Sequence, residues 1–272
     1  ISPERYDLAF RVFKDGRLVE AATVGHFDAI APGATARITL PLTTKTDEAS
    51  EYLVNVELRI KEACAWAEAG YNIADEQFAL TARPAWTAHT SDGGSLTISG
   101  NSVSGTDAEG NAYRMAFDNN GKMTAWTYAG KQILHTNANG TIASGAAPDF
   151  NSCRNIDNDK ESTGTAKIGC VNSSSTKIIK ALTKDDASGC ATMTVQGNAK
   201  NCQYTIRYTF YPDATVDMKT TFSPSGATRR LGLGLQLASG FENVEFYARG
   251  PRSNYSDRKT GSYLGRFTTT VD

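Results

Sequence analysis

The chain has 272 residues, of which 40% are hydrophobic and 21% are charged, and this ordinary globular composition excludes a wholly disordered protein. Its 28 Lys and Arg residues balance 29 Asp and Glu residues, so no strong positive field exists that would attract nucleic acid or an anionic membrane. No apolar run approaches the ~20 residues of a membrane-spanning helix, and we expect a soluble protein of one large or two modest domains.

The first part of the chain alternates between apolar and polar side chains, which is the pattern of half-buried β-strands. Tyr6 to Val12 predicts one strand, and Asp15-Gly16 predicts the tight turn of a hairpin whose second strand is Leu18 to Val24. Further strands are predicted at Ala36 to Leu40, Tyr52 to Ile60 and Gln77 to Thr81. Short strands separated by turn signals, without a helical pattern, favour a small β-sandwich of immunoglobulin type.

A domain boundary is predicted at Arg83-Pro84, because a strand ends there and a polar stretch follows. Beyond it, alternating runs bounded by turn residues predict a second all-β domain. Its predicted strands are Leu96 to Ser99, Ala112 to Asp118, Met123 to Tyr128, Lys177 to Leu182, Ala191 to Gln196, Gln203 to Phe210, Ala214 to Phe222, Leu231 to Leu237 and Val244 to Ala248. The polar segment 137–175 has no periodic pattern, and long loops of this kind often carry function.

The sequence contains five cysteines, none with the spacing of a zinc site or a CxxC redox pair: Cys64, Cys153, Cys170, Cys190 and Cys202. Reduced, buried thiols are the favoured interpretation, with one or two disulfides among the last four as the alternative in an oxidising compartment.

Isolated residues that resemble parts of known sites are interpreted as structural. Gly232-Leu233-Gly234 lies inside an alternating strand, not before a helix, which argues against phosphate binding. His26, His89 and His135 are far apart in sequence and are interpreted as structural or surface residues. A glycosidase needs two carboxylates about 5–10 Å apart across a sugar, and the sequence alone pairs none.

Two polar clusters stand out, Asp149 to Lys160 and Asn243 to Gly261, and both resemble sequence motifs of one protein family. The second cluster resembles the signature of the C-terminal β-sandwich of bacterial β-galactosidases of glycoside hydrolase family 2. In that signature a strand leads into Arg-Gly-Pro and Asn-Tyr-x-Asp-Arg. The residues that carry this resemblance are Arg249, Gly250, Pro251, Asn254, Tyr255, Asp257 and Arg258. In the first cluster, Asp149 to Lys160, Arg154 followed by Asp157-Asn158-Asp159 is similar to a motif near the start of that sandwich. Ala65 to Gly70 with Gln77-Phe78 resembles the end of the preceding immunoglobulin-like domain.

The resemblance implies an immunoglobulin-like β-sandwich over residues 1–83 and a large sandwich similar to that of galactose mutarotases over residues 84–272, each truncated at its outer end. It places the catalytic glutamates in an upstream (β/α)-barrel. This chain would therefore hold no catalytic residue, metal site or cofactor, although the parent enzyme could use a divalent cation such as Mg²⁺.

The function implied by the resemblance is that of a non-catalytic accessory region. The parent enzyme would hydrolyse terminal β-D-galactosides with retention, in the cytoplasm or periplasm of a bacterium, and the partners of this chain would be the barrel and the galactoside. Asp157, Asn158 and Asp159, with the segment 160–167, would border the active site. The Arg249 to Gly261 signature is interpreted as structural, because Arg and Asp side chains can hold a Gly-Pro turn by charge-assisted hydrogen bonds.

Two other functions stay open. In the first, the large sandwich binds carbohydrate in its concave face, with Tyr247, Tyr255, Trp126 and Tyr128 as stacking residues. In the second, the chain is a protein interaction module that uses exposed strand edges. Neither nucleic acid nor a membrane is an expected partner.

Overall fold

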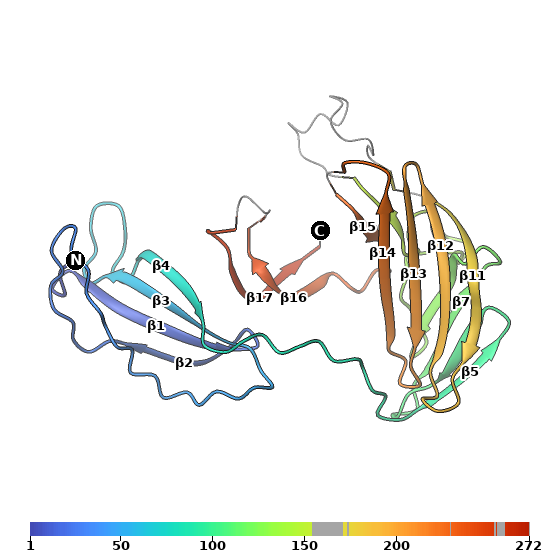
Figure 1. The fold of residues 1–272 in the computed structure, drawn as a ribbon, viewed down its shortest axis with the longest axis horizontal. Coiled ribbons are helices and arrows are strands. Elements are labelled where there is room, and N and C mark those ends of the chain that lie inside the picture. The colour runs from blue at the N-terminus through green and yellow to red at the C-terminus, as the bar shows by residue number, and fades with distance from the viewer. Residues whose placement is uncertain (154–170, 173, 229, 253, 255–258, 272) are drawn as a thin grey trace. The chain divides into compact units, whose positions relative to one another are not determined.

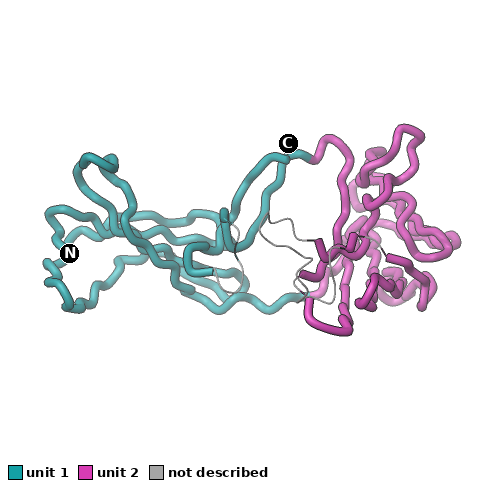
Figure 2. The backbone as a smooth tube through the Cα atoms, turned by 90° about the horizontal axis from the view of Figure 1, so that it is seen from above, with its two compact units in different colours: residues 1–87, 242–272 teal, residues 88–241 magenta. Residues whose placement is uncertain are grey.

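The computed structural model describes residues 1–153, 171–172, 174–228, 230–252, 254 and 259–271. These residues form antiparallel strands joined by turns and loops, with no helix among them, so the prediction of an all-β fold is confirmed. It follows that the described part of the chain has no helix long and apolar enough to cross a membrane. Chain contacts divide the molecule into two compact units, residues 1–87 with 242–272 and residues 88–241 (Figure 2).

The first unit is built on a four-stranded antiparallel sheet with the order β2-β1-β3-β4 (Figure 1). Its strands are β1 (Tyr6–Lys14), β2 (Arg17–Thr23), β3 (Tyr52–Ile60) and β4 (Asn72–Ala79). In the register between β1 and β3, Phe10 lies opposite Val56 and Val12 lies opposite Val54. This apolar face forms the core of the first unit, as the alternation in the sequence predicts.

The predicted strand from Ala36 to Leu40 is wrong, because this segment has no strand structure. Ile38 and Leu40 nevertheless pack against the core of the first unit. The alternation in this segment therefore reflects which side chains are buried, and not which backbone groups pair.

The second unit contains a five-stranded and a four-stranded antiparallel sheet. The first has the order β5-β6-β7-β8-β9, namely β5 (Ser95–Ser99), β6 (Ser102–Thr106), β7 (Ala112–Phe117), β8 (Met123–Tyr128) and β9 (Lys131–Gln132). The other has the order β11-β12-β13-β14, namely β11 (Ser175–Lys184), β12 (Ala191–Ala199), β13 (Cys202–Phe210) and β14 (Val216–Pro224). Side chains from both sheets form one buried cluster, in which the ring of Phe117 lies 5.2 Å from Tyr208 and 5.9 Å from Phe210 between centroids. This is the packing of a β-sandwich.

A short two-stranded ladder accompanies these sheets. It joins β10 (Asp149–Asn151) to β15 (Gly232–Gly234), so the glycine pair lies in a strand, as predicted. The strand β10 itself lies in the segment predicted to be a long loop, because three residues are too few to give a periodic pattern.

The last two strands, β16 (Asn243–Gly250) and β17 (Tyr263–Thr270), form a hairpin that belongs to the first compact unit. The side-chain amide of Gln77 on β4 donates to the carbonyl of Leu264 and accepts from its N–H, both at 2.9 Å. The Tyr247 hydroxyl donates to the buried Glu51 carboxylate at 2.6 Å. These contacts group residues 242–272 with the first sheet, whereas the sequence division at residue 84 assigns them to the second domain; that division stays a prediction.

Candidate functional site

The residues predicted to border an active site, Asp157, Asn158 and Asp159, lie outside the described residues. The same holds for Arg154 and the segment 160–167. The structure does describe the residues on either side of that segment, up to residue 153 and from residue 171. Ser152 and Val171 pair there, since the Ser152 N–H donates to the Val171 carbonyl at 2.8 Å and the Val171 N–H donates to Ser152 Oγ at 3.0 Å.

The signature of the second cluster is described in part, because Tyr255, Asp257 and Arg258 also lie outside the described residues. Arg249 Nη1 donates to the carbonyl of Ser262, and Asn254 Nδ2 donates to the carbonyl of Arg249, each at 2.8 Å. The Gly250-Pro251 peptide bond is cis. These contacts lie within the β16–β17 hairpin, and the structural role of the signature stays a prediction.

A buried carboxylate, Asp149, is the centre of a polar cluster in the second unit. Asp149 Oδ1 accepts hydrogen bonds from Ser174 Oγ at 2.5 Å, from the Tyr204 hydroxyl at 2.8 Å and from the Phe150 N–H at 2.8 Å. Asp149 Oδ2 forms an ion pair with Lys122 Nζ at 3.1 Å. The partners come from the turn before β8, from β10, from the residue before β11 and from β13.

The cluster keeps Asp149 ionised. Burial on its own would raise the pKa of this carboxyl, but the hydrogen bonds from Ser174, Tyr204 and the Phe150 N–H, with that from Lys122, outweigh it and lower the pKa below its usual value. Burial, with the nearby Asp149 charge, raises the pKa of the Tyr204 hydroxyl, which therefore stays a proton donor. The cluster is thus a fixed anion with a cation beside it.

An open cavity of about 350 Å³ lies beside this cluster. Its lining includes Lys122, Asp149, Asn151, Asn172 and Gln236. We call this cavity the Asp149 pocket. Because its lining is mostly polar, it can hold a hydrated or hydroxyl-rich molecule better than an apolar one.

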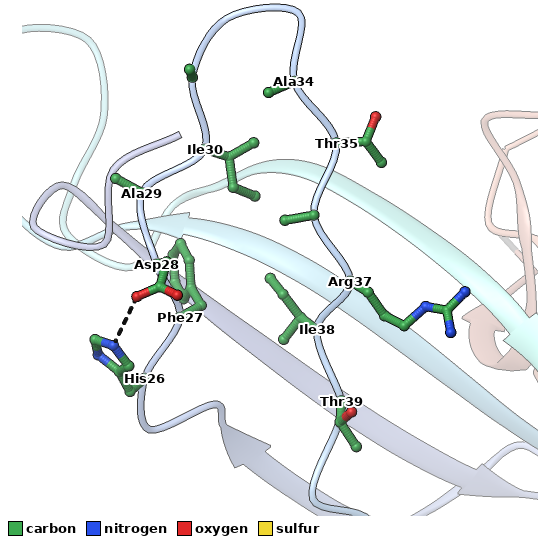
Figure 3. A pocket seen from close by; sticks show the side chains of 12 residues that line it. His26, Phe27, Asp28, Ala29, Ile30, Ala34, Thr35, Arg37, Ile38 and Thr39 are labelled. Carbon is green, nitrogen blue, oxygen red and sulfur yellow. Dashed lines mark ion pairs between the residues drawn. The ribbon is translucent and has the colours of Figure 1, made fainter.

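A larger cavity of about 480 Å³ lies in the first unit, within the loop of residues 26–39 (Figure 3). Figure 3 shows Ile30 and Ile38 pointing between the two arms of this loop, while Arg37 points away. The pair His26 and Asp28, 3.4 Å apart, has side chains that are 82% and 99% exposed. An ion pair so open to water is weak, so this cavity lacks the fixed polar groups of the Asp149 pocket.

The described residues contain no group of three or more His, Cys, Asp or Glu side chains placed to hold a metal ion. Cys153 is disulfide-bonded, which corrects the favoured interpretation of all five cysteines as reduced thiols. Cys64, Cys190 and Cys202 are free thiols.

Of the predicted stacking residues, Trp126 and Tyr128 belong to the second compact unit and Tyr247 belongs to the first. Trp126 and Tyr128 pack against the core of the second unit, and the Tyr128 hydroxyl donates to Asp107 at 2.7 Å. The Tyr247 hydroxyl is bound to Glu51, and Tyr255 is outside the described residues.

Sequence reasoning included Asp149 in a polar cluster but missed its partners Lys122, Ser174 and Tyr204. These residues are 27, 25 and 55 positions away along the chain, so no local motif unites them. The one signal in the sequence was the acidic residue Asp149 directly before the apolar residue Phe150. The structure shows that Phe150 is fully buried.

Comparison with known proteins links this fold to one family. A family model described as beta galactosidase small chain matches residues 109–272, and one described as beta-galactosidase domain 4 matches residues 2–81. A beta-galactosidase of Priestia megaterium is 29% identical over 273 residues, which cover 95% of this chain and 25% of that protein. A beta-galactosidase of Staphylococcus xylosus is 40% identical over 83 residues, or 30% of this chain and 7% of that protein.

The chain therefore spans about a quarter of the Priestia megaterium relative. Since the small-chain model alone covers more than half of the chain, and the domain 4 model covers most of the remainder, the chain belongs to the beta-galactosidase family.

Proposed function

We propose that this chain is the accessory, non-catalytic region of a β-galactosidase that hydrolyses terminal β-D-galactosides with retention. The observation that carries the proposal is the match to two β-galactosidase family models in order along the chain, at residues 2–81 and 109–272. In this proposal the catalytic (β/α)-barrel is supplied by another part of the parent protein. We place no cofactor on this chain and assign any divalent cation, such as Mg²⁺, to the rest of the parent.

The contacts of two buried carboxylates, Glu57 and Asp149, favour a structural role for them over a catalytic one. Retaining hydrolysis requires one carboxylate free to attack the sugar and a second to transfer the proton. Glu57 is instead clamped between the guanidinium groups of Arg11 and Arg59, and Asp149 is held by four hydrogen-bond donors. Groups held in this way orient strands and loops.

We also propose that the segment with Asp157, Asn158 and Asp159 borders the active site of the parent. The Ser152–Val171 pair supports this proposal, because it joins the two ends of the segment beside the rigid Asp149 cluster. A loop anchored at a rigid base can position polar side chains for a substrate held by a different domain.

The test is hydrolysis of a chromogenic β-galactoside by three samples: this chain, the upstream barrel segment of its parent, and a mixture of the two. We expect activity only in the mixture, because each part lacks what the other supplies. Heat-denatured chain in the mixture is the control. Hydrolysis by the chain alone, or full activity of the barrel segment without it, would overturn the proposed role.

The bordering role is tested in the intact parent with Asp157→Asn and Asp159→Asn. We expect KM for the galactoside to rise, since a lost hydrogen bond to substrate weakens binding by about fivefold to tenfold. Asp186→Asn, at an exposed acid outside this segment, is the matched control. Unchanged KM in both loop variants would remove the segment from the site.

A further inference from the structure

We propose that the Asp149 pocket is a binding site for a neutral hexopyranose. The proposal rests on the proposed function only in the choice of D-galactose as the first probe. The size of the pocket, the charge of its lining and the hydrogen-bonding groups of that lining each restrict the kind of ligand that can bind.

The size of the pocket suits a single sugar ring. Its volume of about 350 Å³ is at the lower end of the range for small-molecule sites, roughly 300–1,000 Å³. The walls come from several separate segments, since Lys122 precedes β8, Asn151 ends β10, Asn172 precedes β11 and Gln236 follows β15. A cavity framed by strands of one compact unit has a defined shape before any ligand enters.

The charge of the lining favours a neutral ligand. Among the described residues, Lys122 and Asp149 are the charged ones that line the pocket, and they neutralise each other across 3.1 Å. An anionic ligand would have to compete with Asp149 for Lys122, and a cationic ligand would have to compete with Lys122 for Asp149. A neutral ligand displaces neither partner.

The other polar groups suit hydroxyls. Asn151, Asn172 and Gln236 each carry an amide with both donors and an acceptor, and a sugar hydroxyl likewise donates and accepts. An ammonium has three N–H donors, and Asp149 is the one hydrogen-bond acceptor of the Lys122 side chain among the described residues. Donors therefore remain on Lys122 for a ligand hydroxyl.

The site is also rigid and partly apolar. Ser174 and Tyr204 hold Asp149, and Asp149 holds Lys122, so binding requires little ordering of these side chains. Leu235 lines the pocket and is 40% exposed, which offers an apolar surface for the C–H face of a pyranose.

The experiment is a titration of the ¹⁵N-labelled chain with D-galactose, D-glucose and D-galacturonate, followed by amide chemical shifts. We expect saturable shifts at Gly145, Gly234 and Gln236 with both neutral hexoses, and weaker binding of the anionic sugar. Asn172→Ala and Gln236→Ala should each raise the dissociation constant about fivefold, the effect of one lost hydrogen bond. Gln203→Ala, at an exposed amide on β13, is the matched control and should leave binding unchanged.

Three results would overturn the proposal: no saturable shift at sugar concentrations in the tens of millimolar, tighter binding of galacturonate than of galactose, or unchanged affinity in both pocket variants. Each variant is first shown to keep the unfolding midpoint of the wild type, which is expected for two exposed side chains. The result is independent of the mixing experiment, because hydrolysis by the mixture does not require this pocket. Active mixtures without sugar binding would overturn this inference alone, and binding without active mixtures would overturn the accessory role alone.

Discussion

At the scale of single residues, the Asp149 cluster links stability to pH. Asn in place of Asp149 keeps the shape of the side chain but removes the anion that Ser174, Tyr204 and Lys122 share. We expect Asp149→Asn to lower the free energy of unfolding at pH 7 by about 2 kcal/mol, the cost of buried donors that lose a charged acceptor. Urea unfolding of wild type and variant measures this difference.

The pH dependence of that difference has a definite sign. The pKa of Asp149 is lower in the folded state than the unfolded value of about 3.9. Its stabilisation is therefore complete above the unfolded pKa and is lost as pH falls through the folded pKa. The gap between wild type and Asp149→Asn should shrink from pH 7 to about pH 3. A constant gap would mean that the charge of Asp149 contributes nothing.

The contact between Tyr247 and Glu51 gives a second prediction at this scale. Glu51 is 7% exposed, and burial together with this carboxylate raises the pKa of the Tyr247 hydroxyl, so the hydroxyl remains a donor at neutral pH. Tyr247→Phe should lower the free energy of unfolding by about 1–2 kcal/mol, because it leaves a buried carboxylate oxygen without this donor. Tyr71→Phe, at a ring that is 53% exposed, is the control in the same urea experiment. Equal effects of the two substitutions would contradict the prediction.

At the scale of elements, the turn between β1 and β2 supports the terminal hairpin. A Cβ atom on Gly16 would lie 2.6 Å from the Tyr247 ring and 2.8 Å from Arg266 Cγ. Arg266 Nε also donates a hydrogen bond to the carbonyl of Asp15, which holds the arginine side chain at this turn. Gly16 is therefore a point of close approach between the β1–β2 turn and the β16–β17 hairpin.

Substitutions at two glycines distinguish the cost of backbone strain from the cost of losing this contact. Gly16 and Gly33 both have φ near +76°, but a Cβ on Gly33 would meet no atom within 4 Å. Gly33→Ala should cost about 1 kcal/mol for the left-handed backbone alone, and Gly16→Ala should cost about 1–3 kcal/mol more for the displaced ring. Thermal unfolding monitored by circular dichroism measures both variants. Equal losses would show that the hairpin does not rest on this turn.

The elements also show what alternation in a sequence can predict. The prediction for β3 has the observed bounds, Tyr52 to Ile60, because apolar and polar residues alternate along most of its sequence. β6 was missed because Ser, Gly and Thr surround its one buried residue, Val103, and β17 was missed because its second half is rich in threonine. The Asp149 cluster could not be predicted, since its members meet only after β10, β13 and the turn before β8 have folded together.

At the scale of the whole molecule, the first compact unit is discontinuous in sequence, because residues 88–241 separate its two segments. The family model for the small chain nevertheless runs from residue 109 to residue 272, across that division. A hairpin that belongs to one family domain by sequence thus contacts the sheet of the preceding one. The hairpin is therefore part of the first compact unit, although the small-chain model includes its residues.

The hairpin can be removed without interrupting the second unit. A chain that ends at residue 241 keeps every strand from β5 to β15 and loses β16 and β17. We expect amide hydrogen exchange to stay slow in β12 and β13, whose core lies within the second unit, and to become faster in β4, where Gln77 loses both hydrogen bonds to Leu264. Gln77→Ala in the full chain should accelerate exchange in β4 in the same direction. Faster exchange throughout β12 and β13 would mean instead that the second unit needs the hairpin to fold, and the division into two compact units would not describe two units of stability.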